Sequence, residues 1–207
     1  RTRKMNNLIV DIIPLKVDRL LVESSIKSGG PLMVEGIIQR AGVKNHNGRI
    51  YEREILEREM EKYMEGPVAD NNALGELDHP DSSVINLNNV SHKINKCWWN
   101  GNDVHGQIEI LPTPAGNIAK SLFQAGVPVG ISSRGMGSVE ENTDGVLMVQ
   151  EDFDLLCFDL VSTPSTPGAT LTPQQLREGI QPLITNYTKV NNIIRDIICD
   201  NTGMCKC

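Results

Sequence analysis

The sequence predicts an α+β domain built on a mainly antiparallel sheet. Strand-like and helix-like stretches follow one another in the order strand, helix, hairpin, helix, strand and long hairpin. The clearest single cue is Asn100-Gly101. It stands between two strand-like runs, and Asn-Gly is the preferred pair for the tight turn of a β-hairpin. We therefore expect neighbouring strands to be joined by short turns.

The first predicted core strand covers residues 33–39, where apolar side chains dominate before an Asn-rich loop at 45–49. Residues 52–64 are predicted to form an amphipathic helix that ends at Gly66-Pro67. Four large side chains recur at helical spacing along one side of it, which is the side we expect to be buried. They are Leu56, Met60, Tyr63 and Met64.

The hairpin follows, with predicted strands at 93–99 and 104–110. A second helix is predicted after Thr113. The Thr113 hydroxyl can cap it, Pro114 suits its first position, and Gly126 stands just past its end. These signals are local, so they place the helix without knowledge of the rest of the fold.

Two further strands are predicted at 127–132 and 146–161, with an acidic turn near 142–145 between them. Residues 162–168 form a polar, proline-rich connector. Beyond it, apolar residues spaced four and three apart predict an amphipathic helix at 183–198. We therefore divide the chain into an N-terminal segment (1–31), a main domain (32–172) and a C-terminal helical tail (173–207).

Composition excludes several classes of protein. The chain has 207 residues and a formal net charge of −6, which argues against a sequence-independent nucleic-acid surface. No apolar run reaches the roughly 18 residues of a membrane-spanning helix. Five cysteines without a CxxC pair predict neither a disulfide framework nor a metal site, and Cys97 and Cys157 are expected to be reduced core residues. These features favour a cytoplasmic protein without a cofactor.

The candidate nucleophile lies in the segment Gly130-Ile131-Ser132-Ser133-Arg134-Gly135. An apolar run leads into two hydroxyls, which are followed at once by a cation and a glycine. We expect a strand end here, with a Gly-rich turn whose N–H groups converge on one point. Such a turn could expose a serine oxygen and stabilise an oxyanion, as acyl transfer requires. Either serine could serve.

A general base can be chosen by elimination among four histidines. His46 lies in a polar turn, His105 on the polar side of a hairpin strand, and His92 at the start of a strand. His79 differs because Pro80 restricts it to an extended backbone in a loop between an acid and a proline. We therefore take His79 as the candidate base.

The candidate third member of a triad is Asp159. It interrupts the apolar run Leu155–Val161, and a carboxylate in a buried strand needs a partner such as an imidazolium. Asp152 and Asp154 are the alternatives, at the more polar start of the same strand. Asp154 ranks second.

Taken together, these segments resemble the prohead (capsid-maturation) serine proteases of T4-like tailed bacteriophages. The resemblance covers roughly residues 32–172 and rests on five motifs in the same order. They are Asn47-Gly48-Arg49-Ile50-Tyr51, Gly75-Glu76-Leu77-Asp78-His79-Pro80, residues 98–106 (WWNGNDVHG), residues 130–138 (GISSRGMGS), and Phe158-Asp159-Leu160-Val161 with its following Pro164.

The resemblance implies a closed, largely antiparallel β-barrel with surrounding helices, as in the herpesvirus assemblins. It also implies roles for single residues. Ser132 would be the nucleophile, because the family pattern is Gly–apolar–Ser, with His79 as general base and Asp159 as the orienting acid. The backbone N–H groups of Arg134 and Gly135 would be oxyanion donors. Assemblins use a second histidine as third member, so the aspartate follows the phage branch.

The implied function is cleavage of scaffold core and major capsid proteins inside an assembling prohead in the host cytoplasm. Self-association is left open, and neither a nucleic acid nor a membrane is expected as a partner. The rival from another class is a catalytically silent scaffold or capsid-assembly protein of the same fold. An esterase is disfavoured because the segment after Ser132 lacks the last glycine of G-x-S-x-G.

The resemblance further implies a zymogen that trims itself, with cleavage after a glutamate that has an aliphatic residue two positions before it. Leu176-Arg177-Glu178 fits beyond the connector, and Leu21-Val22-Glu23 fits near the other end. Leu74-Gly75-Glu76 also fits, but a cut there would destroy the His79 loop. Glu23 and Glu178 are therefore the candidate self-cleavage positions.

Overall fold

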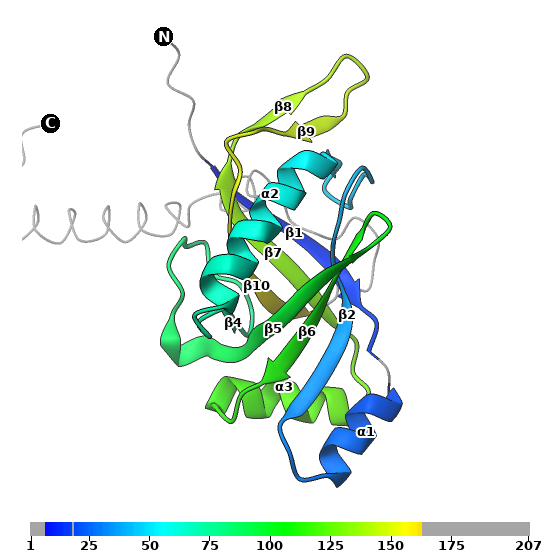
Figure 1. Ribbon diagram of the computed structural model, residues 1–207, viewed down its shortest axis with the longest axis vertical. Helices are drawn as coiled ribbons and strands as arrows, with labels where there is room; N and C mark the ends of the chain where they lie inside the picture. Colours follow the sequence, from blue (N-terminus) through cyan, green and yellow to red (C-terminus); the bar gives the residue numbers. More distant parts are fainter. Residues whose placement is uncertain (1–6, 18, 163–207) are drawn as a thin grey trace, which may run out of the picture. The chain divides into compact units, whose positions relative to one another are not determined.

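The computed structural model describes residues 7–17 and 19–162 (Figure 1). All described residues belong to one unit of the chain, Arg1–Gly168. The predicted C-terminal helix, Glu178 and the last three cysteines lie outside the described residues. Within those residues, no helix is long and apolar enough to cross a lipid bilayer.

Strands make up most of the described chain. They are β1 (Asn7–Leu15), β2 (Leu32–Arg40), β3 (Arg49–Ile50), β4 (Leu74–Glu76), β5 (Val90–Asn100), β6 (Asp103–Ile110), β7 (Val129–Gly137), β8 (Val139–Glu141), β9 (Leu147–Val149) and β10 (Asp154–Ser162). The helical segments are α1 (Arg19–Lys27), α2 (Arg53–Tyr63), the π-helix η1 (Met64–Val68), the 3₁₀ turn η2 (Leu87–Asn89) and α3 (Pro114–Gln124).

The described strands form three sheets, with strand orders β1-β7-β10, β2-β6-β5-β4 and β3-β9-β8. All neighbours are antiparallel except β3 and β9. The main hydrophobic core holds side chains from both larger sheets, including Ile131 of β7, Phe158 of β10 and Ile108 of β6. The α+β class is thus confirmed. The closed barrel is wrong, because the described strands fall into separate sheets.

The predicted first helix corresponds to α2, and its expected buried face is confirmed by Leu56, Met60 and Tyr63. The α-helix ends at Tyr63, just before Gly66-Pro67 as predicted, but a π-helical turn continues through these two residues. The helix widens into η1, in which the Met64 carbonyl accepts a bond from the N–H group five residues later. The carbonyls of Gly66 and Pro67 also accept backbone bonds, so the missing N–H of proline does not stop the helix.

The hairpin and the capped helix are confirmed. Asn100 pairs with Asp103, so the two turn residues are Gly101 and Asn102, one position later than expected. Gly101 has a φ of 58°, a backbone conformation that favours glycine. The Thr113 hydroxyl accepts the N–H of Gly116 at 3.0 Å and caps α3.

The segment 1–31, which we divided from the domain at 32–172, contributes β1 to the sheet of β7 and β10. It pairs along the whole of β7, from Asn7 opposite Gly137 to Leu15 opposite Val129 (Figure 1). The predicted strand at 146–161 is interrupted and forms β9 and β10. As a result β7 has a partner strand on each side. Cys97 and Cys157 are free thiols, as expected.

The two larger sheets meet where β4 and β5 approach β10. His92 of β5 is completely buried, and its Nε2 lies 3.0 Å from the carbonyl oxygen of Phe158 in β10. A carbonyl can only accept, so Nε2 carries the proton and Nδ1 accepts from the Ser91 hydroxyl at 2.9 Å. A Cβ at Gly75 would overlap both Phe158 O and His92 Nε2. The backbone of β4 can therefore lie this close to β10 only because residue 75 is a glycine.

Burial lowers the pKa of His92 to about 4, against an ordinary value of 6.5, because the interior disfavours the imidazolium. Between these two pH values the unfolded chain binds a proton on this residue that the folded chain does not. The free energy of unfolding therefore falls as the pH falls from about 6.5 to about 4.

We expect His92→Gln to reduce this acid sensitivity, because glutamine keeps an N–H donor for Phe158 but does not titrate. The difference in free energy of unfolding between wild type and variant should shrink by about 3 kcal/mol from pH 7 to pH 4. Urea unfolding at a series of pH values measures it. His46→Gln, which removes an exposed imidazole, is the control. Parallel curves for wild type and His92→Gln would contradict the assignment.

Candidate functional site

Ser132 and Ser133 lie in the middle of β7 and, as neighbours in a strand, point to opposite faces of its sheet. Both are buried. The hydroxyl of Ser133 accepts a hydrogen bond from Gln39 Nε2 at 2.7 Å. Among the described residues, the hydroxyl oxygen of Ser132 has no hydrogen-bond partner. Only the Ser132 hydroxyl is therefore uncommitted.

The strand end and Gly-rich turn expected after Ser132 are wrong, because β7 continues to Gly137 with a partner on both sides. Arg134 pairs with Val10 of β1, and Gly135 with Ile9. Successive N–H groups in a paired strand point in opposite directions. The backbone N–H groups of Arg134 and Gly135 therefore do not converge on one point in this conformation.

Asp159 is the cross-strand partner of Ser132, so the two side chains lie on the same face. Asp159 is completely buried. Its Oδ1 accepts the backbone N–H of Glu76 at 3.0 Å, and its Oδ2 lies 3.0 Å from Arg134 Nε. Burial raises the pKa of Asp159, while the Glu76 N–H and the Arg134 cation oppose that rise.

The two alternative carboxylates on this stretch lie elsewhere. Asp154 is exposed at the start of β10. The Asp152 carboxylate accepts bonds from the backbone N–H and the hydroxyl of Ser138, at 2.9 and 2.8 Å. Of the three candidates, only Asp159 lies beside Ser132 and is buried.

A completely buried guanidinium holds this side of the sheet together. Arg134 donates from Nη2 to Glu76 Oε1 at 2.9 Å and to Asp159 Oδ1 at 3.2 Å, and from Nη1 to the Ser82 carbonyl at 2.8 Å. Its Nε also lies 3.2 Å from Cys157 Sγ. We call Arg134, Glu76, Asp159 and Cys157 the arginine cluster.

His79 follows β4 in a segment that runs against β10. Leu77 pairs with Leu160, and the Asp78 N–H donates to the Leu160 carbonyl at 2.7 Å. The His79 side chain is half-buried, and its Nδ1 has no hydrogen-bond partner among the described residues. The structure thus brings the His79 segment to the strand of Asp159.

The hydrogen bond expected between Asp159 and His79 is not formed in the described part of the chain. The Asp159 oxygens are instead bonded to Arg134, the Glu76 N–H and, at 3.6–3.7 Å, the Cys157 thiol. The side chain of Arg134 was not predicted as part of the site, and neither was its bond to Glu76. The sequence did carry a signal for them, since Arg134 and Glu76 are charged residues in the two segments that supply Ser132 and His79.

On the opposite face, a second buried network surrounds Ser133. Asp11 of β1 is its cross-strand partner. The Asp11 carboxylate accepts from the Tyr51 hydroxyl, from Arg49 at 2.9 Å and from Asn47 at 2.6 Å. Burial, followed by the charge of Asp11, raises the pKa of Tyr51 well above 10. The residues 47–51 motif therefore fastens β1 beside β7.

The candidate self-cleavage positions differ in setting. Glu23 is exposed but lies within α1. Glu76 is buried in the arginine cluster. Glu178 lies outside the described residues.

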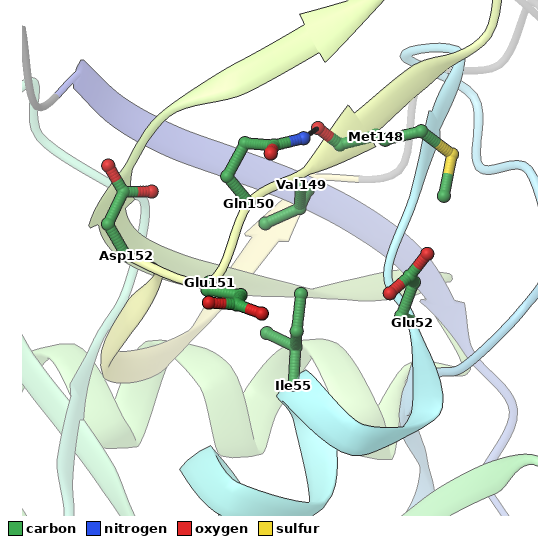
Figure 2. A pocket seen from close by; sticks show the side chains of 7 residues that line it. All are labelled: Glu52, Ile55, Met148, Val149, Gln150, Glu151 and Asp152. Atoms are coloured by element: carbon green, nitrogen blue, oxygen red, sulfur yellow. Dashed lines mark hydrogen bonds between the residues drawn. The ribbon is translucent and has the colours of Figure 1, made fainter. Parts of the chain in front are cut away.

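A cavity of about 540 Å³ lies between the start of α2 and residues 148–152 (Figure 2). Carboxylates of Glu52, Glu151 and Asp152 surround it, with Ile55 and Val149 among its apolar residues. Neither serine nor His79 lines this cavity. In the described residues, no group of three or more His, Cys, Asp or Glu side chains could hold a metal ion.

Comparisons with known proteins agree with the resemblance seen in the sequence. Residues 6–181 match a family described as prohead core protein serine protease. The chain is 34% identical over 175 residues to the prohead core protein protease of Enterobacteria phage T4, covering 83% of this chain and 81% of that protein. The solved structure of the bacteriophage T4 capsid assembly protease, gp21, matches with a TM-score of 0.68 at 29% identity. That match covers 78% of this chain and all of the other.

The family match spans most of the chain, and the sequence identity and the shared fold point to the same group of proteins. The chain belongs to the prohead core protease family, whose members act in phage capsid maturation.

Proposed function

We propose that this chain is a serine endopeptidase in which Ser132 is the nucleophile, His79 the general base and Asp159 the orienting acid. One observation carries the choice of nucleophile. Among the described residues, the Ser132 hydroxyl has no hydrogen-bond partner, although it is buried on β7 and lies directly across from a buried carboxylate. Buried polar atoms are normally paired, so an unpaired one at such a place supports a functional role.

The proposed chemistry follows from these groups. His79 removes the proton from the Ser132 hydroxyl as the oxygen attacks the scissile carbonyl, and later returns it to the leaving amine. Asp159 stabilises the imidazolium that forms between the two steps. Catalytic hydrogen bonds often tighten only when substrate binds. We therefore place the Asp159–His79 bond in the substrate-bound enzyme, after a movement that opens the buried Ser132 to a peptide.

We propose the scaffold core and major capsid proteins as substrates, cleaved inside the prohead while it assembles in the host cytoplasm. The family description and the T4 relatives support this setting. Cleavage after a glutamate with an aliphatic residue two positions before it, self-processing, and the relation to the herpesvirus assemblins are further parts of the proposal. They rest on the sequence resemblance.

The rival function is a catalytically silent capsid-assembly protein of the same fold. It would have no need of an unpaired buried hydroxyl, since an alanine or a fully bonded serine would fit β7 as well. Proteolytic activity of the purified chain, lost in a Ser132 variant, separates the two functions.

Ser132→Ala and Ser133→Ala should have opposite effects on activity and stability. Loss of the nucleophile should lower kcat by about 10⁶-fold, and the midpoint of thermal unfolding should stay equal or rise, because an unpaired buried oxygen is removed. Ser133→Ala should retain activity but cost about 1–3 kcal/mol of stability, since Gln39 loses its acceptor. Peptide cleavage kinetics and thermal melts provide both readouts.

The reverse pattern, with an active Ser132→Ala and an inactive Ser133→Ala, would move the nucleophile by one residue. Activity in both variants would exclude a serine mechanism on β7. A well-folded Ser132→Ala without activity is also the reference for the processing experiment.

Self-processing should release the C-terminal residues by a cut after Glu178. The Leu176-Arg177-Glu178 pattern stands beyond the proline-rich connector, whereas a cut after Glu23 first requires α1 to unfold locally. Intact-mass spectrometry of the purified protein over time should therefore detect loss of residues 179–207 before any loss at the other end.

Glu178→Gln should retain these residues, and in Ser132→Ala the peptide bonds after Glu23 and after Glu178 should both stay intact. Residues 179–207 still attached to a fully active wild-type protein would contradict C-terminal release. Release in purified Ser132→Ala would show that another protease makes the cut.

A further inference from the structure

We infer that the side chains of Arg134 and Glu76 are positioning residues that hold His79 and Asp159 in place relative to Ser132. The inference rests on the proposed function and extends it to two residues that make no contact with the scissile bond in the proposed mechanism. It also gives Arg134 a role for its side chain, in place of the backbone role that the sequence suggested.

The contacts of Arg134 bracket the His79 loop. Its guanidinium binds the side chain of Glu76, three residues before His79 (79 − 76), and the carbonyl of Ser82, three residues after it (82 − 79). Arg134 itself stands two residues after Ser132 on β7 and points to the same face. One side chain of the nucleophile strand thus fixes the loop at two points around the general base.

Asp159 is fixed by the same pair of residues. Arg134 reaches both of its oxygens, at 3.0 and 3.2 Å, and the Glu76 N–H donates to one of them at 3.0 Å. Glu76 also accepts the Asn86 N–H at 3.1 Å, which secures the far end of the loop. The Arg134–Glu76 pair is therefore close to the whole proposed triad. Ser132 is two residues from Arg134 and His79 three from Glu76, while Asp159 is bonded to both members of the pair.

The charges suit a positioning role better than a general contribution to stability. Arg134, Glu76 and Asp159 are all 0% exposed. Buried ion pairs gain little stability because desolvation costs about as much as the attraction returns, and their best attested use is to specify one arrangement. A planar guanidinium can bond several acceptors in fixed directions, whereas a lysine ammonium cannot reproduce that fork.

Two carboxylates face one cation in this cluster, so one negative charge is left without a full counter-charge. Burial raises the pKa of the Cys157 thiol to about 12, so it adds no charge at neutral pH. The other groups here are the exposed carboxylate of Asp78, the Tyr63 phenol and His92, which is bonded to Phe158. Removing the charge of Glu76 would leave Asp159 more fully neutralised by Arg134, with less negative charge beside the base.

The test compares Glu76→Gln and Arg134→Lys with the matched control Glu59→Gln. Glu59 is also a buried carboxylate, 1% exposed, bonded to Arg58, Lys62 and the Leu155 N–H, but it lies on α2. The substrate is a synthetic peptide with the sequence of residues 172–184. Steady-state cleavage from pH 5 to 9 and thermal melts are recorded for each variant.

We expect both site variants to lose at least tenfold in kcat, with KM changed by less than about twofold, because the groups act on the chemical step. In Glu76→Gln the acid limb of the kcat/KM profile should also move to lower pH, since that limb reports protonation of the base. Glu59→Gln should lose comparable stability but keep its kcat and its acid limb.

An unchanged kcat and acid limb in Glu76→Gln would overturn the inference, as would an equal loss of kcat in Glu59→Gln. If Arg134→Lys does not fold, the isosteric Glu76→Gln decides alone. Failure here leaves the proposed function standing as long as Ser132→Ala is inactive. An active Ser132→Ala would refute the proposed function itself, whatever the Glu76 variant does.

Discussion

The site depends on the ion pairs and hydrogen bonds made by the buried guanidinium of Arg134. It joins the strand of Ser132, the strand of Asp159 and the loop of His79, three segments that are far apart in the sequence. Taking a charge out of water costs several kcal/mol unless it is paired and hydrogen-bonded. The fold meets that requirement by supplying two carboxylates and a carbonyl, and in doing so it fixes the neighbourhood of Ser132.

Strand alternation gives two adjacent serines different environments. Ser133 belongs to a bonded network with Gln39 on the face that carries Ile131 and Phe158, while Ser132 lies with Asp159 on the other face. A shift of one residue in the pairing of β7 would exchange these environments. β1 pairs with the whole of β7, and β10 pairs with it from Val129 to Met136, which opposes such a shift. The sheet register itself therefore determines which hydroxyl stays uncommitted.

Local chemistry explains what the sequence could predict. The Thr113 cap, the Asn-Gly hairpin and the apolar face of α2 depend on neighbours a few residues away, and all three are found. β1 and the contacts of Arg134 with Glu76 and Ser82 depend on pairing across more than fifty residues, which no local pattern reports. The prediction of a turn after Ser132 was wrong for the same reason. Glycines suggest a turn, but two long partner strands keep β7 extended to Gly137.

The most direct measurement of the central claim is the site of covalent modification by a serine-directed fluorophosphonate. The active protein is treated until cleavage of a glutamate-containing peptide stops, then digested and sequenced by tandem mass spectrometry. A single adduct on Ser132, in proportion to the activity lost and absent from His79→Ala, is the result predicted by a nucleophile activated by its base. An adduct on Ser133, or complete loss of activity without modification of β7, would contradict the account.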